Sequence, residues 1–124
     1  MLRQYLHLVR LPNVFTAPSN ILTGYFAAVV PVASIDTLQL LLLMSSSALL
    51  YVAGIVFNDY FDIEIDLRER PYRPLPSGSI AIKKALLIGI ISLISANLFA
   101  FVASMSSLVA CIILSVMILS LIHI

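Results

Sequence analysis

Charged residues are scarce in this chain, and their scarcity excludes most soluble proteins. They make up 10% of the 124 residues, hydrophobic residues make up 61%, and the mean hydropathy is +1.10, whereas a soluble domain carries roughly 25% charged residues. The net charge of +1 gives no indication of a nucleic acid partner, which would need a clustered basic face far stronger than this one, so we expect none. The single cysteine, Cys111, has no second cysteine or clustered histidine with which to bind a metal, so we expect a small core residue. The composition indicates an integral membrane protein.

Long apolar runs replace the missing charge. A membrane-spanning helix needs about 20 apolar residues, and no Asp, Glu, Lys or Arg occurs in residues 85–124. Strands of a membrane barrel would alternate apolar and polar residues, and these runs do not. Asn97 lies inside the third run, where we expect an interhelical hydrogen bond. The sequence predicts an all-α, polytopic transmembrane helical bundle with about four spans, at residues 14–33, 38–57, 82–102 and 106–124.

The basic residues predict the orientation of this bundle. All seven either precede the first span or lie between the second span and the first residues of the third, and the opposite connections carry only Asp36 as a charged residue. The positive-inside rule therefore places the N-terminus and the loop at about residues 59–81 in the cytoplasm. We expect the chain to reside in the cell (inner) membrane, with the lipid bilayer as its surroundings.

One short segment, residues 58–66, holds four of the six acidic side chains. Asn58, Asp62 and Asp66 stand four residues apart, so on a continuous helix they would drift only about 40° and rise about 6 Å per step. Carboxylates at this spacing repel one another unless a positive charge lies over them. Mg²⁺ is a suitable cation, because it prefers oxygen ligands and is commonly held by one or two carboxylates plus substrate phosphates. The spacing favours such a diphosphate site over the alternative, a solvated charged loop.

A basic, proline-rich segment follows the acidic one. Pro71, Pro74 and Pro76 restrict the backbone, so we expect an ordered loop rather than a flexible one. Its guanidinium groups are suited to bidentate phosphate recognition, although each arginine could also be only a topology signal. Residues 77–79, Ser-Gly-Ser, predict a turn and the N-cap of the third span. The arginines in question are Arg68, Arg70 and Arg73.

Together these motifs resemble a known family. The pattern Asn58-x-x-x-Asp62-x-x-x-Asp66, followed by the Arg-Pro-x-Arg-Pro-Leu-Pro-Ser-Gly of residues 70–78, is similar to the first aspartate-rich motif and following loop of the UbiA superfamily of intramembrane prenyltransferases. Within that superfamily, the sequence of residues 70–78 looks most like the branch that contains archaeal digeranylgeranylglyceryl phosphate synthases and EboC-type proteins. The opening Val-Arg-Leu-Pro-Asn of residues 9–13 also resembles the first-helix entry of the family.

The resemblance implies a nine-span fold and a Mg²⁺-dependent transfer of a prenyl group from a polyprenyl diphosphate to an aromatic or other small acceptor. Asp62 and Asp66 would be the catalytic residues. Two overlapping ligand sets would surround them. Mg²⁺ would be bound by Asn58, Asp59, Asp62 and Asp66, and the diphosphate by Asn58, Arg68 and Arg73.

The family pattern also includes a second aspartate-rich motif, and this sequence has no acidic residue after Glu69. We therefore expect residues 1–124 to be the N-terminal portion of one longer UbiA-like domain and to be inactive alone. Alternatively, a partner chain could supply the second aspartate-rich motif. The alternative function is a non-catalytic membrane subunit, or a scaffold that binds a cation or an anionic headgroup.

Overall fold

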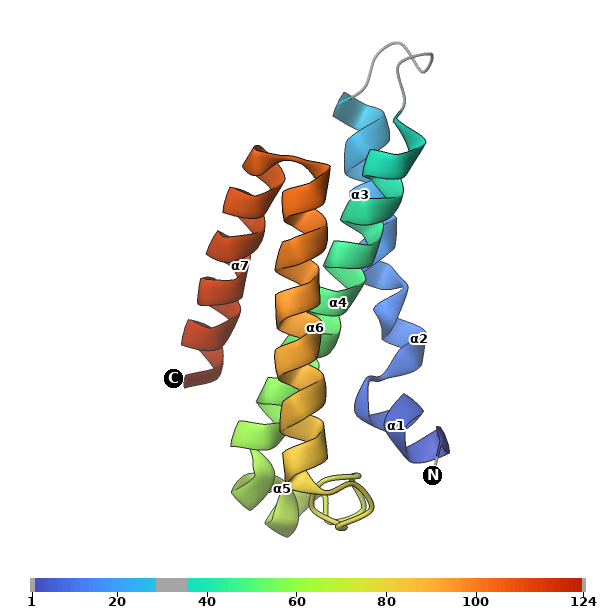
Figure 1. Cartoon of the computed structure of the whole chain (residues 1–124). Coiled ribbons are helices and arrows are strands. Elements are labelled where there is room, and N and C mark those ends of the chain that lie inside the picture. Colours follow the sequence, from blue (N-terminus) through green and yellow to red (C-terminus); the bar gives the residue numbers. More distant parts are fainter. Residues whose placement is uncertain (1, 29–35, 124) are drawn as a thin grey trace.

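The computed structural model describes residues 2–28 and 36–123. Within these ranges every regular secondary-structure element is an α-helix (Figure 1). This confirms the predicted all-α bundle. The helices, in chain order, are α1 (Leu2–Leu8), α2 (Leu11–Val14), α3 (Thr16–Ala28), α4 (Thr37–Phe61), α5 (Ile63–Glu69), α6 (Ile82–Ala103) and α7 (Met105–His123).

The long helix α4 is the centre of the bundle, because it contacts α3, α6 and α7, and it packs most extensively against α6. Small residues on α6 allow this close approach: the buried ones share one face, at the spacing of successive helical turns. At Gly89 an added Cβ would lie 3.1 Å from the ring of Phe57 on α4. The buried residues of α6 are Ala85, Gly89, Ser92, Ala96 and Ala100.

Polar side chains in the apolar helices bond across to their neighbours. The Ser46 hydroxyl on α4 donates to the carbonyl oxygen of Ala96 on α6, at 2.8 Å. Asn97 donates to the Ser115 hydroxyl on α7, at 3.3 Å, which confirms the expected interhelical hydrogen bond. Cys111 is buried in the core that α4, α6 and α7 share, also as expected.

Three described helices are long and apolar enough to cross a membrane: Thr37–Phe61, Ile82–Ala103 and Met105–Ile122. They coincide with the second, third and fourth predicted spans. Part of the first predicted span, residues 29–33, lies outside the described residues, and its described part is formed mainly by α3. Much of the outer surface of α6 and α7 is apolar and exposed, as a helix surrounded by lipid requires.

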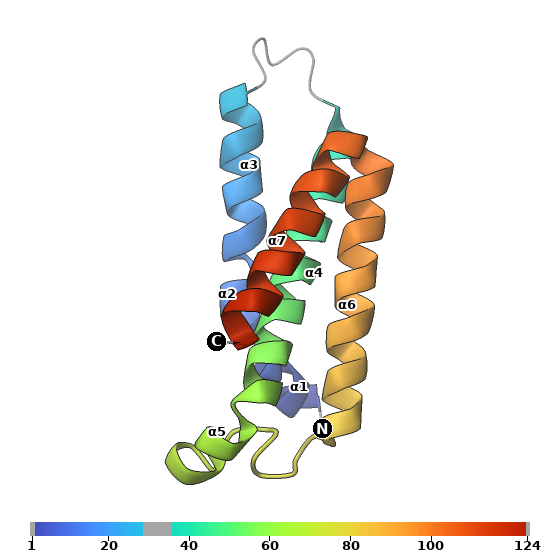
Figure 2. The same ribbon diagram turned by 90° about the vertical axis from the view of Figure 1, so that its left-hand side faces the viewer.

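One end of the bundle gathers the N-terminus, α1, α5 and the loop at residues 70–81, while the α6–α7 turn lies at the other end (Figures 1 and 2). The loop is ordered, as predicted, because Leu75 and Ile80 are buried with Leu8 of α1. Gly78 takes a φ of +71°, which suits its place in a tight turn. The predicted serine N-cap of α6 was wrong: Ala81 is the N-cap, without a side-chain hydrogen bond, and the Ser77 and Ser79 hydroxyls bond to each other instead.

The close contact at Gly89 gives a stability prediction. Gly89→Leu should lower the free energy of unfolding by about 1–3 kcal/mol, because the new side chain must displace Phe57 from a packed interface. The measurement is denaturant-induced unfolding in detergent micelles. Gly24→Leu on α3 is the matched control, because an added Cβ there meets nothing within 4 Å. Equal stability of the two variants would contradict the packing described here.

Candidate functional site: a carboxylate–arginine network

The acidic segment lies where α4 gives way to α5, at the end of the bundle that carries the loop. The helix α4 continues beyond its apolar run to Phe61, so the predicted loop over 59–81 was too long, and its first half is helical. Asp62 separates the two helices with φ −85° and ψ 5°. The predicted continuous stripe of Asn58, Asp62 and Asp66 is therefore interrupted in its middle.

The four oxygen-bearing residues of the motif form two groups. The Asn58 amide nitrogen donates to Asp62 Oδ2 at 2.8 Å, which ties the last turn of α4 to the break. Asp59 and Asp66 lie deeper, with only 5% and 3% of their surfaces exposed. Buried carboxylates at this level need charged or hydrogen-bonded partners.

Arg73 supplies the central partner. Its Nη1 atom donates to Asp66 Oδ2 at 2.6 Å and to Asp59 Oδ1 at 3.3 Å, so one guanidinium group from the loop joins α4 to α5. Burial lowers the pKa of Arg73, but the hydrogen bond to Asp66 and the charges of both carboxylates outweigh burial and raise the pKa above its usual value. The bridge is therefore a fixed positive charge between two acids.

A second arginine reaches the same carboxylate from the N-terminal segment. Arg10 Nη2 lies 2.9 Å from Asp59 Oδ1. Arg10 lies between α1 and α2 with φ 49° and ψ 53°, a left-handed conformation that is uncommon for a residue with a side chain. Such strained backbone persists where the surroundings hold it, and it is often found at functional sites. In this conformation the Arg10 side chain forms the ion pair with Asp59.

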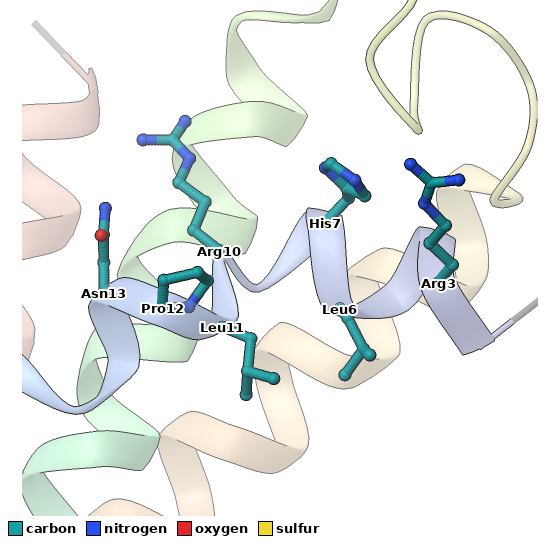
Figure 3. A pocket seen from close by; sticks show the side chains of 7 residues that line it. All are labelled: Arg3, Leu6, His7, Arg10, Leu11, Pro12 and Asn13. Atoms are coloured by element: carbon teal, nitrogen blue, oxygen red, sulfur yellow. The ribbon is translucent and has the colours of Figure 1, made fainter.

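An open pocket of about 620 Å³ lies beside this network. It is lined by α1 and the N-terminal segment on one side and by the loop on the other, with Asp59 as the acidic residue among its lining. Three of its lining residues, Arg3, His7 and Arg10, also line an adjoining cavity, and the view of that cavity in Figure 3 shows them extending to the same side of the α1–α2 segment. We call the pocket beside the network the N-terminal basic pocket, and its charged and histidine lining residues are Arg3, His7, Arg10, Asp59, Arg70 and Arg73.

The structure brings some of the predicted site residues together and leaves others apart. Asp59, Asp66 and Arg73 are in contact, and Asn58 contacts Asp62, as expected for neighbours in one site. Within residues 2–28 and 36–123 no hydrogen bond or salt bridge joins Arg68 to them; it lines a separate pocket of about 390 Å³ with Glu64, Ile65 and Glu69. Arg68 follows the buried Asp66 by two residues on α5, so its side chain is rotated about 200° around the helix axis from that of Asp66.

Sequence reasoning missed Arg10 as a site residue. It lies in the Val-Arg-Leu-Pro-Asn stretch of residues 9–13, which was interpreted as a helix entry and a topology signal. Its spatial partner, Asp59, is 49 positions away, so no local spacing could have paired the two.

The donor set fits a hard cation only in part. In the described ranges no three His, Cys, Asp or Glu side chains converge on one point, and Arg73 occupies the space between Asp59 and Asp66. Mg²⁺, however, needs only one or two carboxylates when phosphate oxygens and waters complete its shell. The Asn58 and Asp62 side chains are half-buried and adjacent, and their oxygens suit that role.

The fold and the network together define a helical membrane protein with an ionic site at one end of its bundle. The model of the UbiA prenyltransferase family matches residues 18–123, so this chain belongs to that family.

Known proteins resemble the chain in sequence and in fold. Digeranylgeranylglyceryl phosphate synthase of Sulfurisphaera tokodaii is 34% identical over 119 residues, which cover 87% of this chain and 41% of that protein. The synthase of the same name from Saccharolobus solfataricus is 35% identical over 114 residues, covering 84% and 39%. A solved structure that concerns digeranylgeranylglyceryl phosphate synthase in membranes has a TM-score of 0.87 at 33% identity, and covers 94% of this chain and 41% of that one. This chain thus spans about two-fifths of the length of these relatives.

The bridge by Arg73 gives a second prediction. Arg73→Ala should lower the free energy of unfolding by about 3 kcal/mol, the low end for breaking a buried ion pair, because it leaves Asp59 and Asp66 buried beside each other. Arg68→Ala removes the same charge from an exposed surface and should change stability by no more than about 0.5 kcal/mol. Thermal unfolding in micelles compares the two. Similar losses in both variants would exclude the bridge.

Proposed function

We propose that this chain provides the diphosphate-binding side of an intramembrane prenyltransferase, which transfers a prenyl group from a polyprenyl diphosphate to a small acceptor. The observation that carries the proposal is that two pairs of motif residues gather at one end of an apolar bundle: Asp59 and Asp66 share Arg73, and Asn58 bonds to Asp62. A charged diphosphate can lie among these side chains while its hydrocarbon chain extends between helices. Membership of the UbiA prenyltransferase family supports the same reaction class.

Asn58, Asp62 and Asp66 are the residues that would hold Mg²⁺, with Asp59 as a further carboxylate. When bound, Mg²⁺ would neutralise the diphosphate and stabilise it as a leaving group. Arg73 would add a fixed positive charge on the same side, where charge develops as the carbon–oxygen bond breaks. The apolar helices would exclude water from the reacting carbon.

The two arginines that the sequence proposes for the diphosphate differ in their surroundings. Arg73 lies within hydrogen-bonding distance of two motif carboxylates, so it needs no rearrangement to reach a ligand bound there. Arg68 lies on the exposed face of α5 and would have to act from outside the network. We therefore assign the larger contribution to Arg73.

For the acceptor, we propose a prenylated glyceryl phosphate. The relatives compared above are named as synthases of digeranylgeranylglyceryl phosphate, a product that carries two prenyl chains on one glyceryl phosphate. Addition of the second chain requires an acceptor that already carries the first chain and the phosphate. The basic residues of the N-terminal basic pocket suit an anionic acceptor of this kind.

A second carboxylate cluster would have to come from polypeptide beyond residues 1–124, either as a continuation of the chain or as a partner. No acidic residue follows Glu69 in this sequence. We therefore expect residues 1–124 alone to show no transfer from geranylgeranyl diphosphate in the presence of Mg²⁺, measured with radiolabelled donor. Robust turnover by this segment alone would show that one aspartate-rich motif is sufficient.

The motif itself is tested by substitution in a protein that contains the whole catalytic domain. Asp62→Asn and Asp66→Asn should each lower the rate of prenyl transfer at least about 100-fold, a typical loss when an electrostatic group of an active site is removed. Asn58→Ala should cost less, because it removes a neutral ligand. Glu64→Gln is the matched control: Glu64 belongs to the same segment but is exposed, and its rate should stay near that of the wild type. Wild-type turnover of both aspartate variants would exclude the proposed role.

The site should lie on the cytoplasmic side, since the basic residues gather at that end of the bundle. In intact cells, after Cys111→Ser removes the native thiol, a cysteine introduced by Ser77→Cys should resist an impermeant thiol reagent. One introduced by Ser106→Cys, at the exposed start of α7, should react. The reverse labelling pattern would show that the chain is inserted with the opposite orientation.

A further inference from the structure

Two arginines of the N-terminal basic pocket have no role in the carboxylate network. Arg10 and Arg73 are ion-paired, but within the described part of the chain neither Arg3 nor Arg70 forms a salt bridge. Both line the same pocket, Arg3 from α1 and Arg70 from the start of the loop. His7 lines it too, one helical turn after Arg3 on the same face of α1 (Figure 3).

The charges at this pocket do not balance. Four arginines line it, and the carboxylates that they contact are those of Asp59 and Asp66. Four positive charges against two negative ones leave an excess of two. A phosphate monoester carries about −1.5 to −2 charges at pH 7 and presents three acceptor oxygens, and guanidinium groups match those oxygens in geometry. The excess therefore fits one phosphate monoester.

The pocket overlaps the proposed diphosphate site only in part. Of the motif residues, only Asp59 lines it; Asn58, Asp62 and Asp66 do not. Arg73, which we assign to the diphosphate, also lines it, as does Arg10 with its ion pair to Asp59. The other basic lining residues, Arg3, His7 and Arg70, remain for a second anionic group.

An adjoining cavity points to an amphiphilic ligand. It has a volume of about 500 Å³, shares Arg3, His7 and Arg10 with the basic pocket, and continues over Leu6, Leu11 and Pro12. Figure 3 shows the two leucines on the side of the α1–α2 segment opposite to the basic side chains. Because this cavity is lined by both cationic and apolar side chains, it suits a ligand with a charged head and a hydrocarbon chain.

The position of α1 is fixed. Leu8 is fully buried among Val56 of α4, Leu75 and Ile80 of the loop, and Ala85 of α6. This anchor holds the face with Arg3 and His7 opposite the loop that carries Arg70. The subsite is therefore formed by contacts already present in the fold.

We propose that Arg3, His7 and Arg70 form a separate subsite for the phosphate monoester of the amphiphilic acceptor, which positions that acceptor beside the diphosphate site. The two arginines would pair with the phosphate oxygens, and the His7 imidazole would donate a hydrogen bond. The assignment rests on the proposed function for the identity of the ligand. Its evidence, the unpaired arginines and the apolar continuation of the pocket, is independent of the aspartate-rich motif.

The test measures binding to the full-length protein that contains residues 1–124, in phosphatidylcholine nanodiscs, by titration followed with ³¹P NMR. The probes observed directly are geranylgeranylglyceryl phosphate and geranylgeranyl diphosphate with Mg²⁺. Their monoester and diphosphate signals are resolved from each other. The same glyceryl lipid without its phosphate gives no ³¹P signal, so its affinity is measured by competition with geranylgeranylglyceryl phosphate. The variant is Arg3→Gln with Arg70→Gln. The control is Lys83→Gln with Lys84→Gln, which removes two exposed charges from the start of α6 at the same end of the bundle.

The double arginine variant should bind the phosphate monoester at least about tenfold more weakly, as expected for lost hydrogen bonds between charged groups. It should bind the diphosphate within about twofold of the wild type, and the lysine control should keep both affinities. Circular dichroism should show the helical content of the wild type. If the arginine variant does not fold, single variants Arg3→Gln and Arg70→Gln should each give a smaller selective loss.

Four outcomes would overturn the subsite. These are unchanged monoester binding in the arginine variants, equal loss of monoester and diphosphate binding, equal wild-type affinity for the lipid without phosphate, and displacement of the acceptor by phosphatidic acid at comparable affinity. The last would indicate a site for bilayer lipid headgroups. Loss of diphosphate binding in the wild type, with selective monoester binding intact, would contradict the proposed function and leave the anion subsite standing.

Discussion

Two carboxylates buried at one end of an apolar bundle are the constraint on which the site depends. Asp59 and Asp66 are almost inaccessible, and neighbouring buried charges of the same sign are expensive unless a cation compensates them. Arg73 provides that cation and thereby fastens the loop to both α4 and α5. Because Arg10 contacts the same Asp59 oxygen, the N-terminal segment is fixed by the same network.

This network links the apolar core to the chemistry. Small residues on α6 allow α6 to lie close to α4, and the core cluster below the loop includes Leu8, Val56 and Leu75. Asp59 and Asp66 belong to the helices α4 and α5, whereas Arg73 comes from the loop and Arg10 from the turn between α1 and α2. Because the helical carboxylates hold both arginines in place, these side chains can bind an anion without first ordering themselves.

The sequence predicted the helical class and the last three spans well, because runs of apolar residues determine where helices cross a bilayer. It also identified the acidic segment and Arg73. It did not predict the break at Asp62, since a spacing of four residues describes a straight helix and contains no information about its end. Nor did it identify Arg10, because its partner Asp59 is distant in the sequence. It also did not predict that Arg68 is directed away from Asp66, since that depends on where α5 begins. The first span is described only as far as Ala28, and the roles in catalysis remain predictions.

The central claim is that this end of the bundle binds a prenyl diphosphate through its aspartate-rich motif and Mg²⁺. Isothermal titration calorimetry of the protein with geranylgeranyl diphosphate, with Mg²⁺ and again with excess EDTA, tests it most directly. We expect saturable binding with Mg²⁺, loss of at least about tenfold in affinity with EDTA because carboxylates and diphosphate then repel each other, and no Mg²⁺ dependence in Asp62→Asn. Equal affinity with and without Mg²⁺ in the wild type would contradict the account.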